Sequence, residues 1–204
     1  MNFLKLTILT LALGATAFSQ DLFTGVSWDI GVPMGTTHDF IEKTSYAGFS
    51  FEGKRFLDED ATVGMTIGWN HFSELTNKTI VLENGAVSGT QVRYANIVPI
   101  LINADYFLGS RGDDMRLFLG MNIGTYHVWQ ELDIGIYAFT DNLWHFGLAP
   151  EAGLWYQLDR NLFFLATFRY NYAFASGDPY LGERKNTFQY LGINLTLGGI
   201  ERVF

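Results

Sequence analysis

The sequence contains no cysteine, which excludes both a disulfide framework and a lipid-anchored N-terminal cysteine. It also has few basic residues, because 21 acidic side chains outnumber 13 basic ones and give a formal net charge of −8. An acidic chain without basic clusters does not favour nucleic acid as a partner. Beyond residue 20 there is no run of 18 apolar residues, so we expect no transmembrane helix.

The first 19 residues predict a cleavable secretory signal peptide. Lys5 supplies a positive charge and residues 6–13 form an apolar core, after which Ala15-Thr16-Ala17 and Ala17-Phe18-Ser19 both have the small-x-small form of a cleavage site. The apolar run is shorter than the ~20 residues of a membrane anchor. We therefore expect cleavage after residue 17 or 19, and a single mature domain over residues 20–204.

The composition is unusual for a domain without an apolar helix. Aromatic residues make up 16% of the chain and charged residues only 17%, and there are 22 glycines. In a membrane β-barrel only alternate residues face lipid, so the hydropathy of each strand averages out. The composition therefore favours a barrel that crosses a membrane with strands.

Eight segments alternate apolar and polar residues with the period of two that is typical of strands. Most of them have the ~9–11 residues that a tilted strand needs to cross a bilayer. No convincing helical pattern remains between them. The predicted strands are Leu22–Gly35, Ser45–Leu57, Thr62–Ser73, Arg93–Leu108, Met115–Gln130, Leu143–Leu158, Leu162–Phe174 and Thr187–Leu197.

The polar face of these segments separates a membrane barrel from a soluble one. A soluble barrel would turn this face to water and fill it with Lys and Glu. Here it consists mainly of Gly, Asn, Thr and Ser, as in Thr167 and Asn171 of the seventh segment. Small residues suit the narrow interior of an eight-stranded barrel. We therefore favour a membrane barrel over a soluble, lipocalin-like one.

Short and long connections alternate along the chain. The short ones cover residues 58–61, 109–114 and 159–161, and the long ones cover 36–44, 74–92, 131–142 and 175–186. This regularity predicts short turns in the periplasm, long loops outside the cell, and both termini on the periplasmic side. Residues 134–139 are expected to continue the neighbouring strands above the membrane. Pro99 and Pro150 lie inside predicted strands, where we expect local bulges.

Three stretches carry a resemblance to a known group of proteins: Ile30–Gly35, Gly147–Leu154 and Tyr190–Leu195. With the strand pattern, they resemble the small outer-membrane β-barrel superfamily of OmpA, OmpX, OmpW and the opacity-type porins. The resemblance implies an all-β fold, a single eight-stranded antiparallel up-and-down transmembrane barrel in the outer membrane of a Gram-negative bacterium. It also implies outer-membrane lipid, lipopolysaccharide and the barrel-assembly machinery as partners.

One departure from the family pattern lies at the end of the chain. The family usually ends on an aromatic residue that closes the last alternating strand. Phe204 is aromatic, but residues 198–202 interrupt the alternation before it. The long loops are where a surface or membrane protein partner would bind.

A set of charged residues falls on the inward face of the predicted barrel. Opposite charges on adjacent strands predict a salt-bridge network, with Glu151 across from Arg169, Asp105 near Arg116, and Asp29 near Glu52 and Lys54. We expect this network to fill the lumen, since eight-stranded interiors are usually filled by side chains. The alternative is a narrow pore for ions or small solutes. The seven residues are Asp29, Glu52, Lys54, Asp105, Arg116, Glu151 and Arg169.

His71 and Ser73 form the one spacing that hints at catalysis. Residues i and i+2 of a strand share a face, so this pair, with Glu74 nearby, matches a nucleophile and base of an outer-membrane lipid hydrolase. The alternative is a polar cap beside Trp69, which we favour because such short matches are common by chance. No histidine has metal-ligand spacing. We therefore expect no enzyme activity, no metal and no cofactor.

Aromatic residues recur at two heights along the strands, near the long loops and near the short turns. Two such rings predict interfacial girdles that hold a barrel at a fixed depth. The predicted girdle residues are Trp69, Trp129, Trp144, Tyr172 and Phe174 at the long-loop side, and Tyr106 and Tyr156 at the short-turn side.

Overall fold

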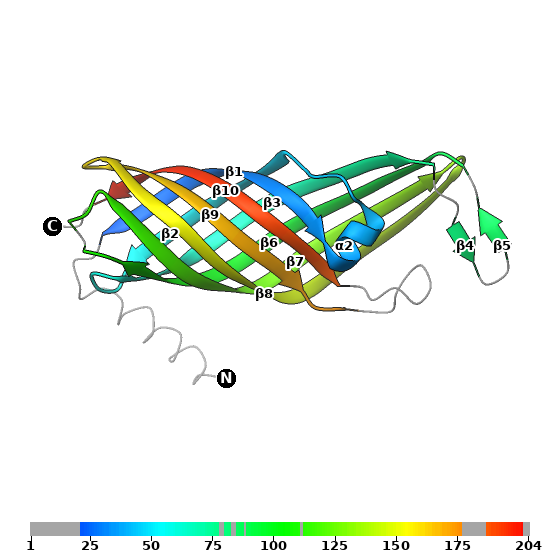
Figure 1. Ribbon diagram of the computed structural model, residues 1–204. Coiled ribbons are helices and arrows are strands. Elements are labelled where there is room, and N and C mark those ends of the chain that lie inside the picture. Colours follow the sequence, from blue (N-terminus) through cyan, green and yellow to red (C-terminus); the bar gives the residue numbers. More distant parts are fainter. Residues whose placement is uncertain are drawn as a thin grey trace, which may run out of the picture.

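The computed structural model describes residues 21–77, 80–82, 85–87, 89–110, 112–176 and 187–201, and they form a closed antiparallel barrel (Figure 1). The order around the barrel follows the chain, and β10 closes it by pairing with β1. The predicted eight-stranded up-and-down fold is therefore confirmed. The barrel strands are β1 (Leu22–Met34), β2 (Ala47–Phe56), β3 (Ala61–Thr76), β6 (Gln91–Leu108), β7 (Met115–Ile134), β8 (Tyr137–Asp159), β9 (Leu162–Ala173) and β10 (Phe188–Glu201).

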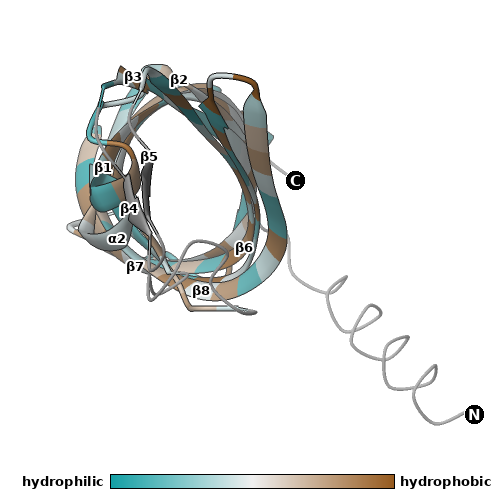
Figure 2. Cartoon of the chain, turned by 90° about the vertical axis from the view of Figure 1, so that its right-hand side faces the viewer, coloured by the Kyte–Doolittle hydropathy of each residue, from teal (hydrophilic) through white to brown (hydrophobic). Residues whose placement is uncertain are grey.

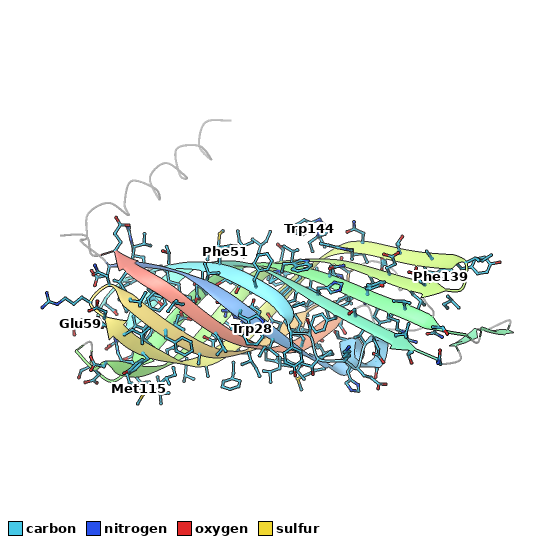
Figure 3. All side chains as sticks on the ribbon, turned by 90° about the horizontal axis from the view of Figure 1, so that it is seen from above. Trp28, Phe51, Glu59, Met115, Phe139 and Trp144 are labelled. Carbon is cyan, nitrogen blue, oxygen red and sulfur yellow. The ribbon has the colours of Figure 1, made fainter. Side chains whose placement is uncertain are left out.

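The period-two pattern divides every strand between a lumen face and an outer face. In β7, Leu117 and Leu119 are 58% and 59% exposed. Residues of the alternate set on the same strand, such as Arg116 and Asn122, are buried in the interior. Trp28, Phe51 and Trp144, labelled in Figure 3, are each about half exposed on the outer face. Seen along its axis, the wall alternates hydrophilic and hydrophobic bands along each strand (Figure 2). The outer face is therefore apolar and the lumen face largely polar.

The two ends of the barrel differ. The turns at residues 57–60, 109–114 and 160–161 lie at one end, here called the short-turn end, and the opposite end is the long-loop end. Glu59 and Met115 mark the short-turn end in Figure 3, with Phe139 near the other. Leu22 pairs with Glu201, and both lie beside the short turns. The barrel domain therefore begins and ends at the short-turn end. The signal-peptide prediction concerns residues that lie outside those described.

The connection between β7 and β8 is much tighter than the loop expected over residues 131–142. The two strands pair without interruption until Ile134 meets Tyr137, and Gly135 makes the turn with a φ of 61°. Glycine adopts this left-handed conformation without the steric cost that a Cβ brings. Accompanied by β6 and β3, which pair up to Ile134 and Gln91 respectively, the two strands run past the ends of β2 and β9 (Figure 1). The expected continuation of the strands over residues 134–139 is thus confirmed.

Two of the long connections contain structure that the pattern did not predict. Helix α2 (Gly35–Phe40) follows β1, and β4 (Ile80–Leu82) pairs with β5 (Gly85–Val87) in the connection after β3. Six residues are too few for a helical period to be visible in a sequence. No helix in the described residues has the length and apolarity needed to cross a membrane.

Strand β10 continues further than the sequence indicated. We expected the alternation to break at residues 198–202, but the pairing with β1 runs in register to Glu201. The pattern is misleading because Ile200 packs against an apolar cluster inside the barrel, so an apolar residue occupies a lumen-facing position. Phe204 and its expected role lie outside the described residues.

The expectation of bulges at the two strand prolines is wrong. On either side of Pro99 the pairs Ile67–Ile100 and Asn70–Ile97 keep one register, so the ladder is interrupted but not shifted. Pro150 behaves in the same way between β8 and β9. The one register shift between these strands lies at Gln157–Asp159, next to the turn. Each proline removes a backbone donor without adding a residue to its strand.

Candidate functional site

The lumen contains a layer of buried charge with Lys54 at its centre. The Nζ atom of Lys54 lies 2.7 Å from Asp105 Oδ2 and 3.3 Å from Glu151 Oε1. It is also 3.4 Å from Glu52 Oε2, on its own strand β2. The ammonium group therefore contacts three carboxylates from three strands. Charges in a narrow interior are costly unless they are paired in this way.

Glu151 links this group to a second cation. Its Oε2 atom accepts a hydrogen bond from Arg169 Nε at 2.6 Å, and the two residues pair directly across β8 and β9. The structure thus places Glu151 opposite Arg169, as the hairpin about residues 159–161 predicted. Because β2 and β8 stand on opposite sides of the barrel, the contact between Lys54 and Glu151 crosses the lumen.

Asp29 lies beside this group but bonds to other partners than expected. Its Oδ1 atom accepts a hydrogen bond from the Ser50 hydroxyl at 3.1 Å, and the Asn194 side chain is a second hydrogen-bond partner. Neither is charged. With Asp29 included, four carboxylates face two cations in the layer, so this part of the lumen is acidic.

The predicted pair between Asp105 and Arg116 is wrong. Asp105 stands across from Gly120 on β7, whereas Arg116 is four residues nearer the short-turn end. Arg116 instead binds Asp60 in the first short turn, with its Nη2 atom 2.6 Å from Oδ1, and its guanidinium lies 5.1 Å from the ring centre of Phe107. Folding a hairpin about its turn gave the correct strands but not the register.

An aromatic layer separates the charges from the short-turn end. Trp155 and Phe163 stack with their ring centres 4.4 Å apart, and Phe23 packs edge-on against both at 5.2 Å. Such contacts are favourable beyond their burial of apolar area. The buried members of the layer are Phe23, Phe56, Phe107, Phe118, Trp155, Phe163 and Leu165.

A second apolar layer lies on the long-loop side of the charges, and helix α2 completes it. Phe40 and Ile41 insert from the helix end into a cluster that includes Phe72 and Tyr190. Arg93 Nη1 donates a hydrogen bond of 2.7 Å to the Phe40 carbonyl. The charged layer therefore lies between two layers of buried apolar side chains.

Two hydrogen bonds hold α2 against the start of β10 and the residue before it. The Thr36 hydroxyl donates to the Thr187 carbonyl at 2.5 Å, and the Thr37 hydroxyl accepts from the Gln189 backbone N–H at 2.8 Å. With the Arg93 bond to the Phe40 carbonyl, the two threonines hold the helix over the lumen.

His71 and Ser73 lie on β3, where His71 bonds to a residue of the neighbouring strand β6. The Nδ1 atom of His71 hydrogen-bonds to Asn96 Oδ1 at 2.8 Å, and its ring stacks on Trp69. Glu74 Oε2 accepts a hydrogen bond from the Glu42 backbone N–H. Among the described residues, no group of three or more His, Asp or Glu side chains is arranged so that it could hold a metal ion.

The predicted girdle residues lie on the outer face at the expected ends. His127 stacks on Trp144 with ring centres 4.6 Å apart and contacts Trp129 at 5.3 Å. Tyr172 packs against Phe174 at 5.1 Å. At the short-turn end, Tyr106 and Tyr156 are 55% and 44% exposed.

Sequence reasoning missed several outward aromatic residues at the long-loop end. Trp28 is 49% exposed and donates a hydrogen bond from Nε1 to the Tyr46 carbonyl at 2.9 Å. Phe49 pairs with Trp28 across β1 and β2 and contacts Trp69 on β3. The signal was present, because Trp28 alternates with lumen residues in its strand. It was overlooked because it lies far from the predicted loop boundary.

No family model matches the sequence, and no curated protein matches it. Solved structures do match. The chain is similar to Ail, the attachment invasion locus protein of Yersinia pestis, at 11% identity over 89% of this chain and 97% of Ail, with a TM-score of 0.50. It is also similar to the outer membrane protein OprG of Pseudomonas aeruginosa, at 12% identity over 89% of this chain and 94% of OprG, with a TM-score of 0.50. The resemblance to small outer-membrane barrels is thus confirmed for the fold.

Proposed function

We propose that the chain is an integral outer-membrane barrel without enzyme activity, with a lumen closed by side chains and a structural or surface-binding role. The observation that carries this proposal is the inverted polarity of the barrel. Leu117, Leu119 and Phe168 expose more than half of their surface on the outer wall, whereas a layer of charged residues is buried in the interior. Such a continuous apolar surface is unfavourable in water and suits lipid. The likeness in fold to outer-membrane barrels supports the same location.

The orientation follows from the difference between the two ends. Short turns face the periplasm and long loops the exterior in barrels of this class. On this basis both termini are periplasmic, and the projecting β7–β8 hairpin, with α2, faces the exterior. Phospholipid and lipopolysaccharide then surround the wall, and the barrel-assembly machinery inserts it.

The closed lumen distinguishes this proposal from a narrow pore. Purified barrel in planar bilayers is expected to produce no stepwise conductance, because apolar layers lie on both sides of the charges. Stepwise openings that disappear in Glu151→Gln or Arg169→Gln would establish the pore instead. A matched variant, Glu59→Gln, changes an exposed carboxylate in a turn and is expected to behave as the unmodified chain.

The surface-binding part of the proposal rests on the projecting hairpin. Between Tyr137 and His145, β8 pairs with β7 on one edge only. Among the described residues no strand pairs with its other edge there, since pairing with β9 begins at Gly147. At the tip, Ile136 is 92% exposed and Tyr137 is 64% exposed. An open strand edge with apolar residues is a template for pairing with another chain.

A photo-crosslinking residue at Ile136 tests this role in intact cells. A surface-binding role predicts a protein adduct of discrete mass at position 136 and none at the lipid-facing position 119. If neither position yields an adduct, the role is structural only. Loss of a lipid deacylation activity in His71→Ala would contradict the non-enzymatic assignment and return His71 and Ser73 to the active-site hypothesis.

A further inference from the structure

An apolar groove of about 540 Å³ runs along the outer wall across β1, β2, β3 and β10. It belongs to neither the lumen nor the aromatic girdles. Its position is defined by cross-strand rows, because Thr24, Gly53 and Met65 pair side by side, and Val26, Phe51 and Ile67 form the next row toward the long-loop end. The side chains along its flanks are Val26, Phe51, Met65, Ile67 and Leu197.

Gly53 forms the floor of the groove, because it has no side chain to fill the space between its neighbours. Its outward neighbours on β2, Phe51 and Arg55, both have large side chains. A Cβ atom at this position would meet only the Thr24 methyl group, at 3.8 Å, which is ordinary contact. Packing within the barrel therefore does not require glycine here. The absent side chain leaves a channel that is open to the surroundings of the barrel.

Arg55 stands at the short-turn end of this channel. It follows Gly53 by two residues on β2 and so shares its outward face, and it pairs with Leu22 on β1 and Val63 on β3. The next outward position along the chain is in the turn at residues 57–60. A guanidinium at this height lies at the boundary of the apolar wall, where lipid phosphate groups are found, and arginine binds phosphate with two parallel hydrogen bonds.

We propose that this groove binds one phospholipid of the leaflet at the short-turn end, with its phosphate on Arg55 and one acyl chain over Gly53. The assignment rests on the proposed membrane location. The direction of the groove fits a lipid, because the polar group lies at the boundary and the apolar channel extends from it toward the middle of the wall. The cation and the anionic phosphate are complementary in charge.

Binding of phosphatidylglycerol to the purified full barrel in mild detergent tests the proposal, measured by native mass spectrometry. Diacylglycerol with the same chains is the second probe, since it lacks the phosphate. The unmodified barrel is expected to hold one phosphatidylglycerol in preference to diacylglycerol. Gly53→Leu fills the channel and is expected to lower the binding of both lipids at least tenfold. Arg55→Gln is expected to reduce phosphatidylglycerol to the level of diacylglycerol.

Ala152→Leu is the matched control, because Ala152 is an exposed small residue on the outer face of β8, opposite β2. Equal lipid binding by Gly53→Leu and Ala152→Leu overturns the proposal, as does equal binding of the two lipids by the unmodified barrel. A dimer that Gly53→Leu dissociates would assign the groove to a second copy instead. Thr24→Leu narrows the same channel from β1 and replaces Gly53→Leu if that variant does not fold. A protein that is soluble without detergent contradicts the membrane location, which is a separate result.

Discussion

At the scale of single residues, the buried charges are the most demanding feature of the lumen. Lys54 and Arg169 are almost fully buried, and Glu151 contacts both of them. A buried ion pair contributes little compared with apolar packing, but removal of one partner leaves an uncompensated charge. The penalty for losing Glu151 is therefore expected to exceed the net stabilisation that the pairs provide.

Glu151→Ala is expected to lower the free energy of unfolding by about 3–5 kcal/mol, since both cations lose a buried partner. Urea unfolding of the barrel in lipid vesicles measures this change. Glu59→Ala, at an exposed turn position, is expected to stay within about 0.5 kcal/mol of the unmodified chain. Equal effects of the two variants would show that the lumen carboxylate is not paired in the membrane.

Asp58 gives the short-turn end a dependence on pH. The backbone N–H groups of Asp60 and Ala61 donate to its carboxylate, and these bonds lower the pKa of Asp58 below its ordinary value of 3.8. A lowered pKa adds stability that is fully present above the unfolded value and is lost as the pH falls through the folded one. The difference in unfolding free energy between the unmodified chain and Asp58→Ala should therefore be constant at neutral pH and shrink below pH 3.8. Urea unfolding from pH 7 to pH 3 measures it, and a constant difference would contradict the assignment.

A contact between two residues could be predicted only where the turn between their strands was short enough to set how the strands align. The three-residue turn before β9 allows few alignments, so Glu151 and Arg169 were placed opposite each other correctly. The six-residue turn before β7 allows more, and there Asp105 and Arg116 were paired wrongly. Lys54 could not be assigned to Glu151 at all, because a contact across the lumen depends on the diameter of the closed barrel.

At the scale of elements, helix α2 depends on its contacts more than on its own sequence. Six residues form too short a helix to be stable alone. Thr37→Val keeps the shape of the side chain but removes the acceptor for the Gln189 N–H, at a cost of about 1 kcal/mol. Because the Ile41 N–H bonds to the Thr37 carbonyl, its hydrogen exchange should accelerate about fivefold. Exchange measured by NMR in micelles checks this, with exposed His38→Ala as the control that should change nothing.

The strands themselves were predictable from alternation, and their ends were not. All eight predicted segments are strands, because one period decides which face meets each environment. The end of β10 was misplaced because Ile200 faces an apolar part of the lumen, where the rule of polar interior residues does not hold. Helix α2 was missed because its burial depends on Phe72 and Tyr190, which are distant in sequence.

At the scale of the whole molecule, the apolar outer wall predicts dependence on detergent. The protein is expected to fractionate with outer membranes and to need detergent for solubility, because exposed side chains such as Leu119 and Phe168 surround the barrel. Circular dichroism in detergent should be dominated by strand. A water-soluble protein, or one with mainly helical dichroism, would contradict the barrel and its location together.

The contact between Lys54 and Glu151 also has a mechanical consequence. A ring of eight strands held together only at its circumference can flatten into an ellipse under lateral pressure, with little change in its hydrogen bonds. Lys54 and Glu151 join opposite sides of that ring, and Arg169 anchors the far end of the contact to the neighbouring strand. Together they act as a strut across the diameter, so the barrel keeps its cross-section when the surrounding lipid is compressed.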